Sequence, residues 1–334
     1  MTGLDRRGAL GLLGLAAAGP AWAEGTTEAG GGVDPRSLGA LCDGRADDSG
    51  PLQRAIDACL AGPFARPLIL PGPCRITRSL FIDRPVDRTR DEFHVIGLGP
   101  AAGFLLDGDL VLFDTRLARP APHAPASEFV TFERVRFDAV SPGRGAFCFS
   151  DGLLRVKLLN CYFTRVRALR AAGYVQSWAF RNCNIRSWPG TFFAVADNLF
   201  DCDWTGNIFE FGEDGISATR AGAQGVRLVA NLVEGSRTFY RQAGGNGLSV
   251  IGNYHEGNGG PDYVLTDRTR GGAARGVALV GNYFAPRAGQ VPIELGDVRG
   301  LASLGNYSTG RLYGPADEPR GGGTSDYAAL SAEQ

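Results

Sequence analysis

The sequence has little of what nucleic-acid-binding and zinc-binding proteins require. Its 34 lysine and arginine residues are balanced by 35 acidic residues, and it contains only three histidines. Phosphate recognition depends on a concentrated basic surface, so a net charge of -1 argues against a nucleic-acid partner. None of the seven cysteines belongs to a C-x-x-C pair. A zinc site or a thioredoxin-like motif is therefore unsupported, and no resident metal is predicted.

The chain also lacks an apolar run long enough to cross a bilayer. Its most apolar segment, GALGLLGLAAAG, follows Arg6-Arg7 and ends close to the small residues Ala21 and Ala23. Such a segment is typical of an export signal. It resembles a twin-arginine signal, with Asp5 at the place where Ser or Thr is usual. We therefore expect a periplasmic or extracellular mature protein without a membrane span.

Glycine, in contrast, is abundant. The chain has 49 glycines and 19 prolines, a combination that favours a structure with many turns over one with long helices. A hydrophobic fraction of 44% is ample for a core.

Short apolar segments that end in asparagine recur along the chain. The seven asparagines are Asn160, Asn182, Asn207, Asn231, Asn253, Asn282 and Asn306. A divergent unit, FVTFERVRF, precedes them with Arg134 in the asparagine position. A period in the twenties with β-branched and aromatic residues predicts an all-β fold, a parallel β-helix with one coil per repeat. Asparagine suits the left-handed bend between strands, and stacked amides can form a hydrogen-bonded ladder. Five residues that follow repeat asparagines are expected to stack in or near the core: Cys161, Cys183, Tyr254, Tyr283 and Tyr307. A disulfide between Cys161 and Cys183 stays open.

A different periodicity precedes the repeats. Apolar residues recur at helical spacing behind Ser49, with Pro51 in the first turn: they are Leu52, Ala55, Ile56, Cys59 and Leu60. A short amphipathic helix here would cover the open end of the solenoid core.

This region also carries a family resemblance. The order DGRADDSGPLQRAIDA, followed by LILPGPCRI, resembles the opening of the pectate lyase superfamily. The matching positions are Asp43-Gly44, Asp47-Asp48-Ser49, Gln53, Ala55-Ile56-Asp57 and Leu70-Pro71-Gly72. The resemblance implies a right-handed parallel β-helix to about residue 312, and it extends to the twin-arginine-exported repeat proteins of that superfamily. It also implies that sugar chains lie along a groove beside one parallel sheet, and that Asp47 and Asp48 cap the helix.

Together these features predict four segments. They are a signal peptide at 1–23, a linker at 24–36, a parallel β-helix at 37–312 with a capping helix at about 50–61, and a glycine-rich tail at 313–334.

Three glutamates stand at one repeat position. Glu210, Glu234 and Glu256 each lie three residues past a repeat asparagine, on successive coils. Carboxylates about 4.8 Å apart repel one another, so a shared proton, a cation such as calcium, facing arginines or divergence into solvent must offset the cost. Both a catalytic row and a solvated face stay open. His255, beside Glu256, is a candidate base at a position that tolerates any residue.

Two further segments resemble polygalacturonase-type glycoside hydrolases. GEDGISA places Glu213 and Asp214 on that family's paired acids, and GGNGLSVIG has Asn246 at its histidine position. Asp197 could supply a third acid. The alternative for Asp214 is a role in a turn or cap.

A lyase needs a cation for the substrate carboxylate and a base. Arg237, Tyr240 and Arg241 are the candidates, and arginines paired with the glutamates are the alternative. Trp188, next to Pro189-Gly190, is a candidate exposed platform for a sugar ring.

The sequence thus predicts an exported β-helix protein that acts on an acidic or neutral polysaccharide. The enzymatic version is a glycoside hydrolase or polysaccharide lyase, with no required cofactor predicted and calcium left open. The alternative is a non-catalytic glycan-binding or cell-surface structural solenoid.

Overall fold

The computed structural model describes residues 31–62, 65–82, 92–114, 127–141, 146–149, 153–218, 222–265 and 273–314. All described helices and strands lie in the unit that begins at Gly32. The predicted signal peptide and the predicted tail from residue 315 fall outside the described residues. Within the described ranges, no helix is long and apolar enough to span a membrane.

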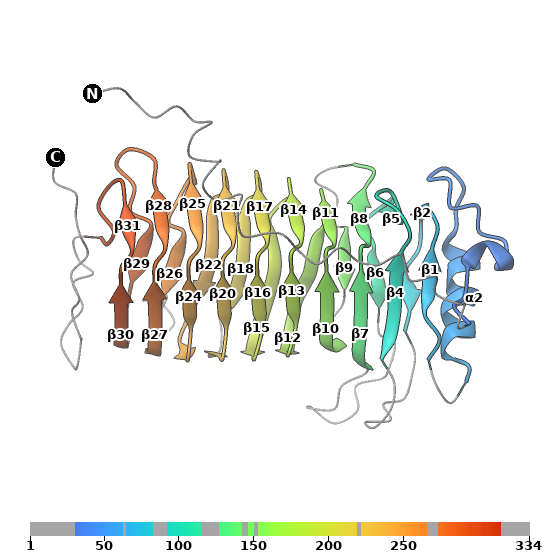
Figure 1. The fold of residues 1–334 in the computed structure, drawn as a ribbon, viewed down its shortest axis with the longest axis horizontal. Helices are drawn as coiled ribbons and strands as arrows, with labels where there is room; N and C mark the ends of the chain where they lie inside the picture. Colours follow the sequence, from blue (N-terminus) through green and yellow to red (C-terminus); the bar gives the residue numbers. More distant parts are fainter. Residues whose placement is uncertain are drawn as a thin grey trace, which may run out of the picture. The chain divides into compact units, whose positions relative to one another are not determined.

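The described chain is a parallel β-solenoid, as predicted, and each strand pairs with strands of the preceding and following coils (Figure 1). Three columns of strands form it, which we name by their first strands. The β1 column contains β1 (Leu68–Leu70), β4 (Phe93–Gly97), β7 (Ser127–Glu133), β10 (Leu153–Leu159), β13 (Ala179–Arg181), β16 (Asp203–Thr205), β20 (Arg227–Val229), β24 (Ser249–Ile251), β27 (Ala274–Val280) and β30 (Val298–Leu304).

The β2 column is a ten-stranded parallel sheet within the described residues. It contains β2 (Pro73–Ile76), β5 (Gly103–Leu106), β8 (Arg136–Ala139), β11 (Tyr162–Thr164), β14 (Asn184–Arg186), β17 (Ile208–Glu210), β21 (Leu232–Glu234), β25 (Tyr254–Glu256), β28 (Tyr283–Ala285) and β31 (Tyr307–Ser308).

The β3 column contains β3 (Leu80–Phe81), β6 (Val111–Asp114), β9 (Phe147–Phe149), β12 (Arg167–Gln176), β15 (Thr191–Phe200), β18 (Asp214–Ala218), β22 (Thr238–Gln242), β26 (Tyr263–Leu265) and β29 (Ile293–Leu295). Two short strands, β19 (Ala223–Gln224) and β23 (Gly245–Asn246), connect the end of β15 to the start of β27. They join the β1 and β3 columns into one sheet.

The repeat asparagines occupy two different positions, which corrects the single role predicted for them. Asn160 and Asn182 are exposed and adopt the predicted left-handed backbone, with φ of 54° and 53°. From Asn207 onward the left-handed residue is the one before the asparagine, such as Gly206 or Ala230. Strand register explains the difference, because Asn184 pairs with Ile208 and therefore Asn182 lies opposite Gly206.

The later asparagines are buried and form the predicted ladder. Each Nδ2 donates to the Oδ1 of the next coil, at 2.9 Å for Asn207 to Asn231, 2.9 Å for Asn231 to Asn253, 3.0 Å for Asn253 to Asn282, and 2.8 Å for Asn282 to Asn306. Cys161 and Cys183 take the corresponding places in the two coils before the ladder. Both are free thiols, and they donate to backbone carbonyls of Phe132 and Leu158 at 3.4 and 3.3 Å.

Rows of aromatic side chains fill the space between the columns. Phe137 stacks on Phe163 of the next coil with ring centroids 4.7 Å apart, and Phe180 stacks on Trp204 at 5.8 Å. Because parallel coils place equivalent residues one strand spacing apart, similar side chains fall into contact without a separate packing arrangement for each coil.

The α-helix that the described residues contain, α2 (Ser49–Leu60), covers the first coil, as predicted, and follows a 3-10 turn, η1 (Pro35–Leu38) (Figure 1). Its buried residues are Ser49, Leu52, Ala55, Ile56 and Cys59, which pack towards β1, β2 and β3. Asp48 occupies the N-cap position, but its side chain makes no capping hydrogen bond and instead accepts backbone N–H groups of the preceding loop. The Asp47 Oδ1 accepts the Ser49 backbone N–H at 3.0 Å, at the start of the helix.

Asn231→Ala tests the ladder. The change removes the Nδ2 donor to Trp204 O at 2.9 Å and the Oδ1 acceptor of both Asn207 N–H groups. Buried groups without partners are costly, so we expect a loss of about 3 kcal/mol in the free energy of unfolding, measured by urea denaturation.

Asn184→Ala is the matched control, because Asn184 lies half-buried on the outer face of β14. We expect it to change stability by less than about 0.5 kcal/mol. Equal losses in the two variants would contradict a stabilising role for the ladder.

Candidate functional site

The outer face of the β2 column carries two parallel rows of side chains. The tyrosine row consists of Tyr162, Asn184, Ile208, Leu232, Tyr254, Tyr283 and Tyr307, in register from strand to strand. The charged row, two residues further along each strand, consists of Thr164, Arg186, Glu210, Glu234, Glu256 and Ala285. Residues between the rows, such as Phe209 and Val233, are fully buried.

Strand register therefore confirms that Glu210, Glu234 and Glu256 occupy one position on three successive coils. Equivalent residues on neighbouring strands lie about 4.8 Å apart, so each carboxylate has another as its neighbour. The geometry required for a row of acids is present.

One end of the charged row is neutralised by an arginine. Arg186 Nε donates to Glu210 Oε2 at 2.5 Å, and only 14% of the Glu210 side chain is exposed. The hydrogen bond to Glu210, followed by its charge and the charge of Glu234, raises the pKa of Arg186. A facing arginine was one of the predicted ways to offset the repulsion between the glutamates. The arginine that does so is Arg186, and neither Arg237 nor Arg241.

The other end of the charged row is bound to a tyrosine. Tyr254 OH donates to Glu256 Oε2 at 2.8 Å. Burial, and then the hydrogen bond to Glu256, raises the pKa of Tyr254 to about 12. The phenol therefore stays protonated and remains a donor at any ordinary pH.

Glu234 lies between these two partnered glutamates. Its side chain has no hydrogen-bonding or ion-pairing partner among the described residues, and it is half-buried. It is thus the carboxylate of the charged row that is free to bind another molecule.

Three tyrosines continue the outer face beside the charged row. The ring centroids of Tyr254 and Tyr283 lie 4.8 Å apart with an interplanar angle of 4°, and those of Tyr283 and Tyr307 lie 5.3 Å apart at 17°. Because the rings stack on one another, their edges and hydroxyls line the surface rather than their faces.

A second charged group lies at the corner between the β2 and β3 columns. Arg237 donates from Nε to Asp214 Oδ1 at 2.8 Å and from Nη2 to Oδ2 at 2.5 Å, and Glu213 Oε2 lies 3.9 Å from Nη2. The hydrogen bonds to Asp214 raise the pKa of Arg237. Asp214 is therefore held in a bidentate pair.

The polygalacturonase-like acids do not meet their expected partners. Asp214 begins β18 opposite Thr191, whereas Asp197 is exposed six residues further along β15. Asn246, at the position of that family's histidine, lies in β23 between the β3 and β1 columns. The two segments thus lie on different corners of the solenoid.

Three other candidates lie inside the core, which corrects their predicted contact with a substrate. His255 is 1% exposed, with Nδ1 3.1 Å from Asp262 Oδ1 and Nε2 2.9 Å from the Tyr263 hydroxyl. Tyr240 is fully buried and donates to Gln242 Oε1 at 2.8 Å, and burial raises its pKa well above the usual value.

Trp188 is likewise no exposed platform. It is 2% exposed, and its Nε1 donates to the Asp214 carbonyl at 2.7 Å. Gly212 is required beside it, because a Cβ there would lie 2.0 Å from the indole ring. Arg241 is half-buried on the outer face of β22, opposite Ser217 and away from the charged row.

The sequence interpretation missed Arg186. It predicted correctly that Tyr254, Tyr283 and Tyr307 stack, but they lie on the outer face and not in the core. Arg186 follows Asn182 by four residues, whereas Glu210 follows Asn207 by three. Aligning the repeats on asparagine therefore displaced Arg186 from the position of the glutamates, and only strand pairing restores it.

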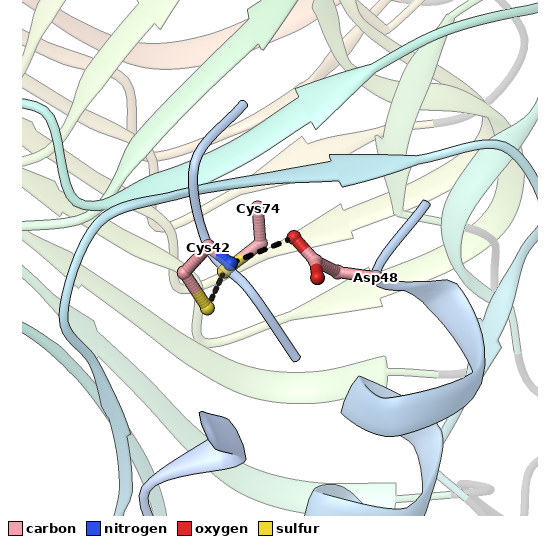
Figure 2. Close-up of side chains that lie close together, drawn as sticks. All are labelled: Cys42, Asp48 and Cys74. Atoms are coloured by element: carbon pink, nitrogen blue, oxygen red, sulfur yellow. Dashed lines mark hydrogen bonds between the residues drawn. The ribbon is translucent and has the colours of Figure 1, made fainter. Parts of the chain in front are cut away.

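The charged row is not the tightest set of metal-ligating side chains. Among the described residues, Cys42, Asp48 and Cys74 bring one ligand atom each within 4.8 Å of the others (Figure 2). Calcium at the row of Glu210, Glu234 and Glu256 stays one of the open alternatives.

No family model matches the chain, and no curated protein matches it. Several solved structures do align with it. They include the tailspike protein of Acinetobacter baumannii phage AM24 (17% identity, 84% of this chain, 52% of that chain, TM-score 0.60), the Streptococcus pneumoniae surface protein and adhesin PfbA (12%, 83%, 92%, 0.49) and the Azotobacter vinelandii mannuronan C-5 epimerase AlgE4 A-module (16%, 86%, 100%, 0.30).

These identities are low, so the likeness to the tailspike shows a parallel β-helix fold and nothing finer. The chain spans about half the length of that tailspike. Membership in the pectate lyase superfamily and twin-arginine export stay predictions.

Glu234→Gln tests repulsion along the charged row. Removing the central charge relieves two contacts between like charges, so we expect the free energy of unfolding to rise by up to about 1 kcal/mol at low salt. The gain should shrink as salt screens the row. The control is Glu294→Gln, an exposed carboxylate on β29. Destabilisation by Glu234→Gln at every salt concentration would contradict the arrangement.

Proposed function

We propose that this chain binds a polysaccharide along the outer face of the β2 column and hydrolyses its glycosidic bonds at the charged row. The observation that supports this proposal is the contrast between neighbouring carboxylates. Glu210 is bound to Arg186, whereas Glu234, one strand away, has no partner among the described side chains.

A pair of carboxylates in unlike surroundings suits glycoside hydrolysis. One group must be ionised and the other must carry a proton, and a separation of about 5 to 5.5 Å between them suits a retaining mechanism. Neighbouring strands supply about that spacing. In our proposal Glu210, beside Arg186, is the nucleophile, and Glu234 protonates the departing sugar oxygen and then activates water.

The chemistry of the face favours a substrate rich in hydroxyls over a polyanion. The charged row has one arginine against three glutamates, and the tyrosine row presents phenol groups beside it. Carboxylates accept hydrogen bonds from sugar hydroxyls, but they repel sugar carboxylates. A neutral polysaccharide is therefore the substrate class that we propose.

A lyase mechanism has less support. Of its three candidate residues, Tyr240 is fully buried and Arg237 is bound to Asp214 through both oxygens. The third, Arg241, lies on the outer face of β22, away from the charged row.

Binding without cleavage is the second candidate. Stacking fixes the tyrosines in one geometry, and Glu256 is fixed by Tyr254. Such a rigid strip could recognise an extended chain without any chemistry.

Glu234→Gln separates the two candidates. For a hydrolase we expect release of new reducing ends from neutral polysaccharides to fall by about 10²- to 10⁴-fold, since general acid-base groups contribute about that much. Binding of the polysaccharide in affinity electrophoresis should persist. Glu294→Gln, on another column, should retain full activity.

Two outcomes would contradict hydrolysis. One is product absorbance near 235 nm, which reports the unsaturated sugar of a lyase. The other is that the unmodified protein binds neutral polysaccharides but releases no new reducing ends from any of those tested.

Tyr283→Ala tests the binding face directly. The change removes the central ring of the stack. We therefore expect the dissociation constant for the polysaccharide, measured by affinity electrophoresis, to rise roughly 10-fold. Tyr283→Phe keeps the ring, so it should lose only the part of the binding affinity that the hydroxyl contributes. Unchanged retention in Tyr283→Ala would exclude the tyrosine row from binding.

A further inference from the structure

Two cysteines meet at the junction between the capping segment and the first coil. Cys42 lies in the loop between η1 and α2, and Cys74 lies in β2, the first strand of its column. Their Sγ atoms are 2.9 Å apart, and Asp48 lies beside them (Figure 2). Cys42 is 8% exposed, and Cys74 is fully buried.

The loop that carries Cys42 is held against β2 by several backbone contacts. Asp48 accepts the backbone N–H groups of Leu41 and Cys42, at 2.7 Å through Oδ1 and 3.1 Å through Oδ2. Gly44 N–H donates to Pro73 O at 2.7 Å. The two thiols therefore face each other because the backbone on both sides is fixed.

The backbone near Cys42 is also unusual. Cys42 has a φ of 49°, a left-handed conformation that few residues other than glycine adopt. Gly72 lies against it, and a Cβ at that position would be 2.6 Å from the Cys42 carbonyl oxygen. This close approach brings the Cys42 thiol down onto β2, where Cys74 lies.

We propose that Cys42 and Cys74 form a disulfide that links the capping segment covalently to the first coil. A disulfide bond is about 2.05 Å long, so the thiols need to approach by less than 1 Å.

The oxidation takes place by exchange with a donor disulfide. The Cys42 thiolate attacks one sulfur of the donor, forms a mixed disulfide and releases one donor thiol. The Cys74 thiolate then attacks the Cys42 sulfur and releases the second donor thiol. Two electrons and the two thiol protons pass from the protein to the donor. Cys42 reacts first because Cys74 is inaccessible, and because the Cys42 contact and burial raise the pKa of the Cys74 thiol.

The same cluster fits a metal ion less well. Two thiolates bound to one tetrahedral zinc at about 2.3 Å lie roughly 3.8 Å apart, further than the 2.9 Å between these sulfurs. Both oxygens of Asp48 already accept backbone N–H groups. A site of two thiolates and one carboxylate would also bury a net negative charge, whereas a disulfide is neutral.

The crosslink would act on the part of the solenoid that α2 covers. Cys42 and Cys74 are separated by 32 positions and enclose all of α2. Closing this loop restricts the unfolded chain and resists separation of the helix from β1, β2 and β3. The end of the core would then be protected covalently as well as by packing.

The test uses the full chain after incubation with oxidised glutathione. Free thiols are alkylated under denaturing conditions without reductant, and tryptic peptides are analysed by mass spectrometry. Arg66 precedes Pro67, so trypsin leaves Cys59 and Cys74 in one peptide. Fragmentation within that peptide must then show which of them is linked to the peptide that contains Cys42.

We expect a Cys42–Cys74 linkage and five alkylated cysteines. Reductant should lower the melting temperature by on the order of 5 °C. Cys42→Ser should melt at the lower temperature with or without reductant, and Cys161→Ser should keep the full response to reductant. Alkylation of both Cys42 and Cys74, a linkage to Cys59, or one equivalent of bound zinc that is lost in Cys42→Ser would overturn the proposal.

Discussion

The structure depends on strand register between successive coils, and from Asn207 onward a ladder of buried amides fixes that register. Each ladder asparagine before Asn306 donates to the next one, and every one of them also donates to a backbone carbonyl of the preceding coil. A slip by one residue would leave these groups buried without partners, at a cost of about 1 to 3 kcal/mol each. The hydrophobic rows between the columns tolerate approximate alignment, whereas the hydrogen-bonded amides do not.

Because the register is fixed, residues that recur periodically in the sequence become neighbours on the surface. Because each coil repeats the same position, Glu210, Glu234 and Glu256 become neighbours although each is separated from the next by more than 20 residues. The same rule stacks the tyrosines beside them. Arg186 at one end and Tyr254 at the other give the three carboxylates different surroundings. A repetitive scaffold thus gives the charged row a distinct centre, at Glu234.

The sequence was sufficient to predict parallel coils, the cap and the row of glutamates, because periodicity and helical spacing are local properties. It was insufficient where the direction of a side chain depends on the backbone conformation at a corner between two strand columns. Trp188 follows a left-handed residue, Ser187, and turns into the core. His255 could have been placed correctly, since side chains alternate along a strand and both of its neighbours face outward. Its partners Asp262 and Tyr263 lie across a corner, so no local pattern indicated how a buried imidazole is satisfied.

The central claim is that the charged row is the surface that contacts a glycan. Carbodiimide coupling of glycine ethyl ester, followed by mass spectrometry, measures the reactivity of each carboxylate with and without a bound polysaccharide. The account predicts that a neutral polysaccharide protects Glu234 and Glu256 while Glu294 and Glu213 react as before. Protection at Glu213 or Glu294 with an unprotected charged row would contradict it.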